Sequence, residues 1–396
     1  MHSTISHRLV PVLLAVVFSI PSVAEQKNYD AGAAKSEIKV GNIVPYTGKF
    51  AQYGVNGRAE AAYFRMINDR GGINGRRINF ISLDSTSDTG KALPLARQLI
   101  EQDHVLLIVG IWGTPANLAV RSYLNKKKVP QLFVAAPDSA FNDPSHFPWT
   151  MGFQATKRTE GLNYARYIIG IKPAAKIAIL YANDASGKEW LLGIREGLGD
   201  KAAAMIVKEI AFEYSVPTAL DSKIDALNAT GADVFLNMAV GRFATEAIRH
   251  AYDVGWHPLQ FIPNASISTE AFLDPAGLEK AKGIVANARS KFWSDRSDPG
   301  VRAFLDWMKK YNSGASLRDA ENIYGYEVAQ ALVEVLRRCG DELTPANVMK
   351  QATHLDLELG MLRPGIKVTT SPTDYQPIKQ LFLVKFDGRH WRPISD

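Results

Sequence analysis

The feature that most constrains the fold is an alternation of short apolar runs with longer amphipathic segments, which occurs twice along the chain. In the first set the runs begin 40, 28 and 25 residues apart, at Ile38, Ile78, Leu106 and Gln131. In the second set they begin 29, 29 and 25 residues apart, at Lys176, Met205, Val234 and Leu259. Short runs rich in β-branched and aromatic residues are typical of strands buried on both faces. Connections of this length join parallel strands through helices, so the sequence predicts two similar α/β lobes with doubly wound parallel sheets.

The amphipathic segments predict where the principal helices lie. Between residues 58 and 69 the apolar side chains fall on one helical face, and Gly71-Gly72 ends the helix. A longer helix is expected over about residues 318–339. Thr344-Pro345 has the capped start of another, because proline is tolerated in the first helical turn. Residues 380–394 alternate around Asp387-Gly388, which predicts a hairpin.

Length, charge and cysteine content narrow the class of protein. The chain of 396 residues suits two domains, since single cores stop growing at roughly 250–300 residues. Lys and Arg total 46 against 40 Asp and Glu, a small excess that is not gathered in a basic run and argues against nucleic acid as a partner. The one cysteine, Cys339, excludes an internal disulfide and a cysteine-based metal site. No dinucleotide fingerprint or clustered histidines are present, so no cofactor or metal is expected.

Residues 1–24 have the features of a secretory signal peptide. An apolar stretch runs from Leu9 to Ile20, and Ser22-Val23-Ala24 supplies the small residues that a signal peptidase recognises. The stretch is short for a bilayer span, so a retained membrane anchor is the weaker alternative. Secretion without disulfides suits a bacterial periplasm, where we expect the mature chain. Residues 25–36 are expected to form a loose leader.

The loops that follow the predicted strands indicate a binding cleft. In an open parallel sheet, ligands bind beyond the carboxyl ends of the strands. The loops at that edge are rich in Gly, Ser, Thr and Asn and include Tyr53 and Trp112. Backbone N–H groups at helix starts favour an anion such as a carboxylate, and aromatic rings supply an apolar wall. These loops therefore predict a site for a small molecule.

The chain resembles the periplasmic substrate-binding proteins of ABC importers, above all the branched-chain amino-acid (Leu/Ile/Val-binding) type with the type I periplasmic-binding fold. The resemblance spans about residues 37–395 and rests on the order and spacing of several segments. These are IKVGNIVPYTGKFAQYG (38–54), AEAAYFRMINDRGGINGRRI (59–78), LLIVGIWGTPAN (106–117), KIAILYANDASGKEW (176–190) and GADVFLNMAVGRFATEAIRHAYDVGW (231–256).

The resemblance implies two lobes joined by three crossovers, near residues 153–157, 282–288 and 358–366. Lobe 1 would hold residues 37–153 and 284–357. Lobe 2 would hold residues 156–282 and 362–396. The segment 143–159, which carries proline, glycine and aromatic residues, is the candidate hinge.

The resemblance also implies which residues contact the ligand. The first lobe would contribute Tyr53, Trp112, Gly113, Thr114, Ala135, Ala136, Pro137 and Tyr324. The second lobe would contribute Ser186, Ala239, Asn264 and Ala265. Structural alternatives exist for three of them, because Tyr53 and Trp112 could serve packing and Thr114 could be a helix cap.

One departure from the family pattern concerns the ligand's ammonium group. Amino-acid binders of this type place an acidic residue where this chain has Asn264-Ala265. An unpaired buried ammonium costs several kcal/mol, so an amino-acid ligand requires another carboxylate. Asp138 and Asp184 are the nearby candidates, and either could instead be a turn or cap residue.

The function implied is that of a solute-binding component of an ABC importer, which closes on a small carboxylate-bearing ligand. A hydrophobic or branched-chain amino acid is the first candidate, and an aromatic carboxylate or short amide is the alternative. The expected partners are this ligand and a membrane permease, and the protein is expected to be a monomer without enzymatic activity. A periplasmic sensor accessory would share these features. A secreted hydrolase is a distant alternative, since Ser186-Gly187-Lys188 is not a nucleophile elbow.

Overall fold

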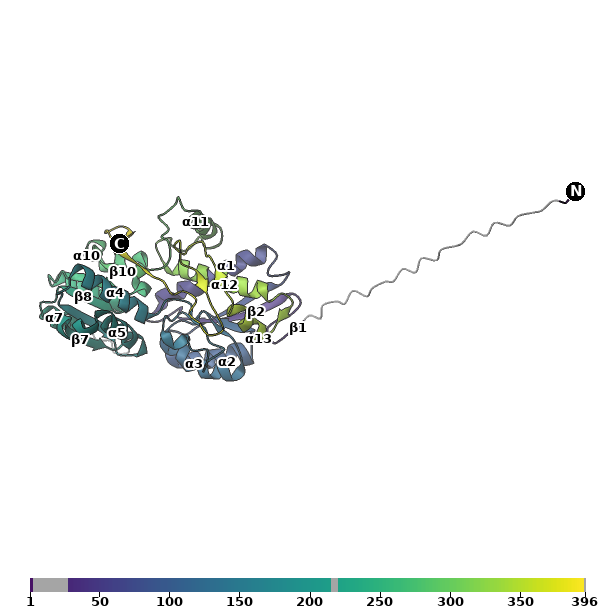
Figure 1. Cartoon of the computed structure of the whole chain (residues 1–396), viewed down its shortest axis with the longest axis horizontal. Helices are drawn as coiled ribbons and strands as arrows, with labels where there is room; N and C mark the ends of the chain where they lie inside the picture. Colours follow the sequence, from purple (N-terminus) through teal and green to yellow (C-terminus); the bar gives the residue numbers. More distant parts are fainter. Residues whose placement is uncertain (3–27, 215–219, 395–396) are drawn as a thin grey trace.

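Two β-sheets, one in each lobe, organise the computed structural model of the chain (Figure 1). The structure describes residues 1–2, 28–214 and 220–394, so the predicted signal peptide lies almost wholly outside the described residues. The first sheet is parallel throughout and has the order β3-β2-β4-β5. Its strands are β2 (Glu37–Val44), β3 (Arg77–Asp84), β4 (Leu107–Val109) and β5 (Gln131–Leu132).

The second sheet has seven strands in the order β15-β14-β10-β9-β8-β6-β7. Its parallel strands are β6 (Ile177–Ala182), β7 (Ile206–Phe212), β8 (Val234–Met238), β9 (Leu259–Ile262) and β10 (Val285–Ala288). An antiparallel hairpin of β14 (Phe382–Phe386) and β15 (Trp391–Pro393) completes the edge. Every predicted strand is confirmed, and so is the C-terminal hairpin.

Helices pack on the faces of the sheets. Those of lobe 1 are α1 (Val55–Asp69), α2 (Ala92–Glu101), α3 (Thr114–Lys127), α11 (Pro299–Tyr311), α12 (Glu321–Arg338) and α13 (Pro345–Ala352). Those of lobe 2 are α4 (Lys157–Ile171), α5 (Ala185–Leu198), α6 (Ala202–Met205), α7 (Asp221–Asn228), α8 (Arg242–Asp253), α9 (Asp274–Ala276) and α10 (Leu278–Ala281). Within the described residues, none of these helices is long and apolar enough to cross a membrane.

Short elements complete the fold. Two small ladders pair β1 (Asn28–Tyr29) with β11 (Glu342–Leu343) and β12 (Asp356–Leu357) with β13 (Val368–Thr369). Two 3₁₀ turns matter for the site, η1 (Ala51–Gly54) and η5 (Asn264–Ser266). The remaining short turns are η2 (Thr89–Lys91), η3 (Ser139–Phe141), η4 (Gly199–Lys201) and the π-turn η6 (Thr269–Leu273).

The expected helices form close to their predicted limits. The first helix begins at Val55, three residues before its predicted start at residue 58, because the 3₁₀ turn η1 leads directly into it. The long helix spans Glu321–Arg338, and Thr344 caps α13 by accepting a hydrogen bond from the Asn347 N–H. The sequence patterns therefore locate the elements to within a few residues.

Two of the three predicted lobe boundaries require correction. The predicted boundaries place residues 284–288 in lobe 1, yet β10 pairs with β9 and β14, so this crossover follows Ala288. The segment after residue 362 was assigned to lobe 2, yet Ile366, Tyr375 and Ile378 lie in the lobe 1 core. The third crossover therefore lies between Ile378 and β14. In both places the local sequence fits either lobe, and only the tertiary contacts decide which.

Glycines allow α4 and α5, which flank the interlobe cleft, to approach closely. A Cβ at Gly193 would lie 2.0 Å from the carbonyl oxygen of Arg158, and one at Gly161 would lie 2.5 Å from that of Trp190. No real Cβ tolerates such contacts with backbone, so both positions require glycine. This packing matters for function because α4 begins at Lys157 and Ser186 lies in the first turn of α5.

We predict that Gly193→Ala destabilises lobe 2 by about 1–3 kcal/mol, because the added methyl group forces α5 away from α4. Gly170→Ala is the matched control, since its Cβ meets nothing within 4 Å at an exposed position of α4. The control is expected to be neutral or stabilising by about 0.5–1 kcal/mol. Urea unfolding followed by circular dichroism measures both, and equal midpoints for the two variants would contradict the close packing.

Candidate ligand-binding site

A cavity lies between the lobes, beyond the carboxyl ends of both parallel sheets. It encloses about 1300 Å³ of empty space, counting the part open to solvent. The loops after β2, β4 and β5 line it from lobe 1, and the loops after β6, β8 and β9 line it from lobe 2. The starts of α3, α5 and α12 also reach it. This is the edge of the sheets at which the sequence predicts a ligand.

Most of the predicted contact residues line this cavity. They are Tyr53, Trp112, Gly113, Thr114, Ala135, Ala136, Pro137, Asp184, Ser186, Asn264, Ala265 and Tyr324. Two predicted residues, Asp138 and Ala239, lie behind the lining. Ala239 is fully buried and its neighbour Val240 lines the cavity instead, because side chains alternate at the end of β8.

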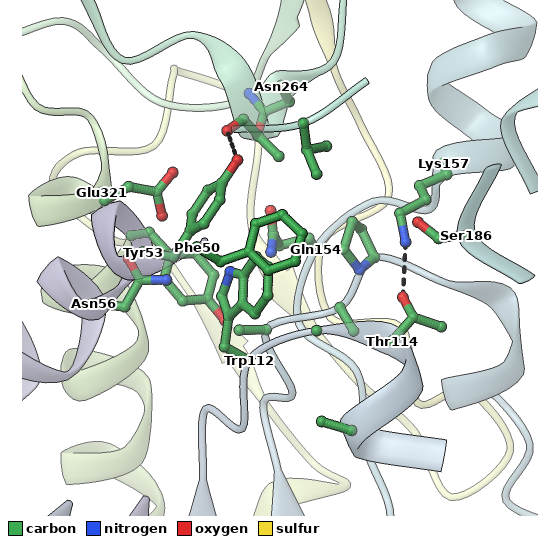
Figure 2. A pocket seen from close by; sticks show the side chains of 18 of the residues that line it. Phe50, Tyr53, Asn56, Trp112, Thr114, Gln154, Lys157, Ser186, Asn264 and Glu321 are labelled. Atoms are coloured by element: carbon green, nitrogen blue, oxygen red, sulfur yellow. Dashed lines mark hydrogen bonds between the residues drawn. The ribbon is translucent and has the colours of Figure 1, made fainter. Parts of the chain in front are cut away.

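Aromatic side chains form one wall of the cavity (Figure 2). The rings of Tyr53 and Trp112 are stacked with centroids 4.6 Å apart, and the Phe50 ring lies 5.0 Å from that of Trp112. Tyr214 from lobe 2 meets the edge of Phe50 at 5.3 Å. Trp112 thus packs against other rings and also lines the cavity, so its contact with a ligand stays a prediction.

Tyr53 connects the two lobes through its hydroxyl group. The hydroxyl donates to the carbonyl oxygen of Ala265 at 2.9 Å and accepts from the N–H of Gly241 at 3.0 Å. Burial raises the pKa of Tyr53 well above its usual value, so the hydroxyl remains protonated and able to donate. A further cross-lobe bond joins Lys49 Nζ to the carbonyl oxygen of Tyr214 at 3.1 Å. These contacts describe a closed arrangement of the lobes.

Hydrogen-bond donors gather at one end of the cavity. Lys157 Nζ donates to Thr114 Oγ1 at 2.8 Å, and both groups bind the carboxylate of Asp138. Ser186 faces them from the first turn of α5 (Figure 2). The starts of α3 and α5 place N–H groups and the positive ends of two helix dipoles at the same point. This donor end is suited to an anionic group such as a carboxylate.

The two predicted partners for a ligand ammonium differ in their availability. Asp138 is buried and pairs with Lys157, so its charge is already compensated. Asp184 lines the cavity, and one of its oxygens accepts the Gly187 N–H as the cap of α5. Asp184 therefore serves as a cap and as a carboxylate at the cavity, whereas Asp138 organises the donor end from behind.

A buried acid lies behind the loop that replaces the family's acidic position. Glu160 accepts hydrogen bonds from Trp190 Nε1 at 2.6 Å and from the Asn264 N–H. Burial raises the pKa of Glu160 to about 7, although these donors and nearby Lys157 oppose the rise. Glu160 fixes the Asn264-Ala265 turn but is not among the lining residues.

An ion pair at the second crossover supports the cavity floor. Arg289, immediately after β10, contacts Glu327 of α12 at 3.2 Å, and both side chains are buried. Arg289 also donates to Gln154 Oε1 at 3.1 Å and Asn264 Oδ1 at 3.0 Å. Gln154 lies at the first crossover, so the network joins two hinge segments to both lobes.

Several lining residues were not predicted from the sequence. They are Phe50, Asn56, Gln154, Lys157, Tyr214, Arg289 and Glu321. Phe50 lies inside a loop that the strand rule selects, and Gln154 and Lys157 lie inside the predicted hinge segment, so a sequence signal existed for these three. Tyr214 follows β7, Asn56 and Glu321 lie in the first turns of α1 and α12, and Arg289 lies at the second crossover. Only the tertiary fold brings these four residues to the cavity.

Comparison with known proteins agrees with this geometry. The family model described as periplasmic binding protein matches residues 37–390. The Leu/Ile/Val-binding protein homolog 1 of Brucella abortus is 24% identical over 343 residues, covering 84% of this chain and 87% of the relative. Among the described part of the chain, no group of histidine, cysteine or acidic residues is arranged to hold a metal ion.

Solved structures share the fold at low identity. A branched-chain amino acid ABC transporter protein from Thermus thermophilus with bound valine aligns with a TM-score of 0.81 at 15% identity, covering 91% of this chain and 96% of that one. A fatty acid ABC transporter substrate-binding protein from Thermomonospora curvata aligns with a TM-score of 0.79 at 19% identity, covering 92% and 94%. The match of the family model to nearly the whole folded part, on a two-lobed fold with a cleft between the lobes, shows that this chain belongs to the periplasmic binding protein family.

Proposed function

We propose that the protein is the solute-binding component of an ABC importer and acts in the periplasm. Its ligand is a small carboxylate-bearing molecule, and a hydrophobic or branched-chain amino acid is the first candidate. The observation that carries the proposal is an interlobe cavity with hydrogen-bond donors at one end and an aromatic wall beside them. The family is one of binding proteins rather than enzymes, which agrees with this assignment.

The mechanism is closure of the two lobes around the ligand. The ligand carboxylate would meet Thr114 from lobe 1 and Lys157 and Ser186 from lobe 2, so each lobe supplies part of the site. Closure removes water from the cavity and forms the cross-lobe bonds of Tyr53. A ligand that contacts both lobes binds the closed form better than the open form and therefore shifts the population toward it.

The closed form would then dock on a membrane permease through both lobes, with the protein acting as a monomer. A periplasmic sensor accessory would use the same closure and differ only in its membrane partner. Copurification with a permease or with a sensor receptor after cross-linking in cells separates these two roles.

A carboxylate without an ammonium group is the second candidate ligand. The observation in its favour is that Asn264-Ala265 offers no acid and that Lys157 compensates Asp138. The Brucella relative is named for binding leucine, isoleucine and valine, whereas the Thermomonospora protein is named for fatty acids. Asp184 distinguishes the amino-acid ligand from the carboxylate without an amine. It lines the cavity and caps α5, whose first turn also carries Ser186 of the donor end.

Calorimetry with leucine, phenylalanine, benzoate and a short aliphatic amide tests the proposal directly. We expect the carboxylates to bind more tightly than the amide, because an ionised acceptor gains more from the donor end than a neutral one. Small-angle scattering should show a smaller radius of gyration in the bound state. Tight binding with an unchanged radius would contradict closure and indicate a rigid pocket.

Tyr53→Phe tests the connection between the lobes. The variant loses two hydrogen bonds that form only on closure, each contributing about 0.5–1.5 kcal/mol. We expect the ligand dissociation constant to rise by roughly 5- to 150-fold. Tyr46→Phe is the control, because the Tyr46 hydroxyl bonds to Ser82 within lobe 1 at 2.6 Å. Equal affinities in the two variants would show that the Tyr53 bonds do not support binding.

Asp184→Asn tests the ammonium site. Asparagine caps a helix about as well as aspartate, so the fold should be retained. If the ligand is an α-amino acid, its affinity should fall about tenfold or more, since a hydrogen bond to a charged group contributes about 1.5–3 kcal/mol. The affinity of the matching acid without the amine, 4-methylpentanoate for leucine, should change little. Parallel losses for both ligands would argue against an ammonium contact.

A further inference from the structure

The cavity has a second polar end, separated from the donor end by the aromatic residues. Figure 2 shows Asn56 and Glu321 on one side of Tyr53, Phe50 and Trp112, with the donor end on the other side. Asn56 belongs to α1 and Glu321 is the first residue of α12. Both helices are in lobe 1, so this end forms independently of closure.

Close packing of α1 on α12 places the two side chains together. A Cβ at Gly325 would lie 2.6 Å from the carbonyl oxygen of Asn56, so only glycine permits this approach. Glu321 lies one helical turn before Gly325 and therefore next to Asn56. The Asn56 amide faces the Glu321 carboxyl group and opposes the rise of its pKa. The amide oxygen of Asn56 is left free to accept.

Asn56 supplies an acceptor that has no partner. The side chain is 2% exposed, and its Oδ1 atom makes no hydrogen bond in the described structure. A buried carbonyl oxygen without a donor costs about 1–3 kcal/mol. An unsatisfied acceptor that lines a ligand cavity indicates that a donor is supplied by the ligand.

The charged side chains that line the cavity also favour a ligand group that carries positive charge. Each lining cation is paired with an acid: Lys157 with Asp138, Arg289 with Glu327, and Lys291 with Asp298.

The lining acids are not paired. Among the described residues, no ion pair forms to Glu321, Asp184 or Asp88. Within this part of the chain, Asp184 and Asp88 therefore bring uncompensated negative charge to the cavity, and Glu321 is a carboxyl group without a cationic partner there.

We propose that Asn56 and Glu321 form a subsite for a cationic nitrogen group, an ammonium or guanidinium, at the end of the ligand distant from its carboxylate. The proposal deepens the function given above and rests on it. The ligand class becomes a small carboxylate whose apolar middle lies along the aromatic wall and whose far end carries N–H donors. Two acceptors on adjacent helices suit such a group, because it donates in more than one direction.

The protonation of Glu321 gives the subsite a measurable signature. Burial and neighbouring Asp319 raise the pKa of Glu321 to about 8, while Arg289 and Asn56 oppose the rise. The phenols of Tyr53 and Tyr324 also face this carboxyl. Near pH 7 the free site therefore holds a proton on Glu321. A bound cation favours the ionised carboxylate, so ligand binding should release that proton.

The test compares two ligand pairs that differ only in a distal ammonium: norleucine with lysine, and 4-methylbenzoate with 4-(aminomethyl)benzoate. We expect the ammonium to improve affinity about tenfold or more in at least one pair, as a charged hydrogen bond does. Glu321→Gln should remove this gain while leaving the affinity for the methyl-terminated ligand within about threefold. Glu279→Gln, an exposed acid on α10, is the matched control and should retain the gain.

Calorimetry in phosphate and Tris buffers at pH 7 measures proton release on binding. The ammonium ligand should release close to one proton from the wild-type protein and markedly less from Glu321→Gln. Thermal unfolding checks that both variants are folded, and Asn56→Asp provides a second variant that retains the shape and adds an acceptor charge.

The possible outcomes separate this subsite from the proposed function. Tight binding of 4-methylbenzoate or norleucine with closure, but no gain from the ammonium, overturns the subsite and leaves the solute-binding function intact. A gain that persists in Glu321→Gln also overturns the subsite. Failure of every carboxylate to bind overturns the proposed function and the subsite together.

Discussion

The closed arrangement of the lobes depends on the Tyr53 hydroxyl, which bonds to the Ala265 carbonyl oxygen and the Gly241 N–H across the cleft. Both partners are backbone groups in the loops that follow β9 and β8, so the bonds fix the position of the lobe rather than one side-chain conformation. The ring of Tyr53 stacks on Trp112, which ties the same contact to the loop after β4. One side chain thus takes part both in the contact between the lobes and in the aromatic wall.

Much of this architecture follows from the sequence, because a buried parallel strand leaves a clear local pattern. The eight apolar runs locate the strands, and the rule that ligands bind at their carboxyl ends selects the loops that line the cavity. The lobe boundaries were less predictable. Residues 285–288 form a short strand that would fit either sheet, and its pairing with β9 is a long-range event. Residues 366–378 are mostly polar, and only isolated apolar side chains anchor them in the lobe 1 core.

The charge balance of the site could not be predicted from the sequence for a related reason. Asp138 was a candidate for binding an ammonium, but its partner Lys157 comes from the other side of the first crossover and is recognisable only when the chain is folded. The sequence does not single out Glu321, because an acid at a helix start ordinarily interacts favourably with the helix dipole. Its special position arises from Gly325, which allows α12 to approach Asn56.

The distribution of paired and unpaired charges couples closure to ligand binding. The lining cations Lys157 and Arg289 already have buried acids as partners, so closing the empty cleft leaves no cation uncompensated. Closing it over Glu321 and the free Asn56 oxygen removes water from a carboxyl group without a cationic partner and from an acceptor without a donor. A ligand with N–H donors supplies the missing partners and so removes a cost that only the closed form incurs. The ligand therefore favours the closed form in two ways. It supplies the hydrogen-bond donors that the empty closed form lacks, and it makes contacts with both lobes.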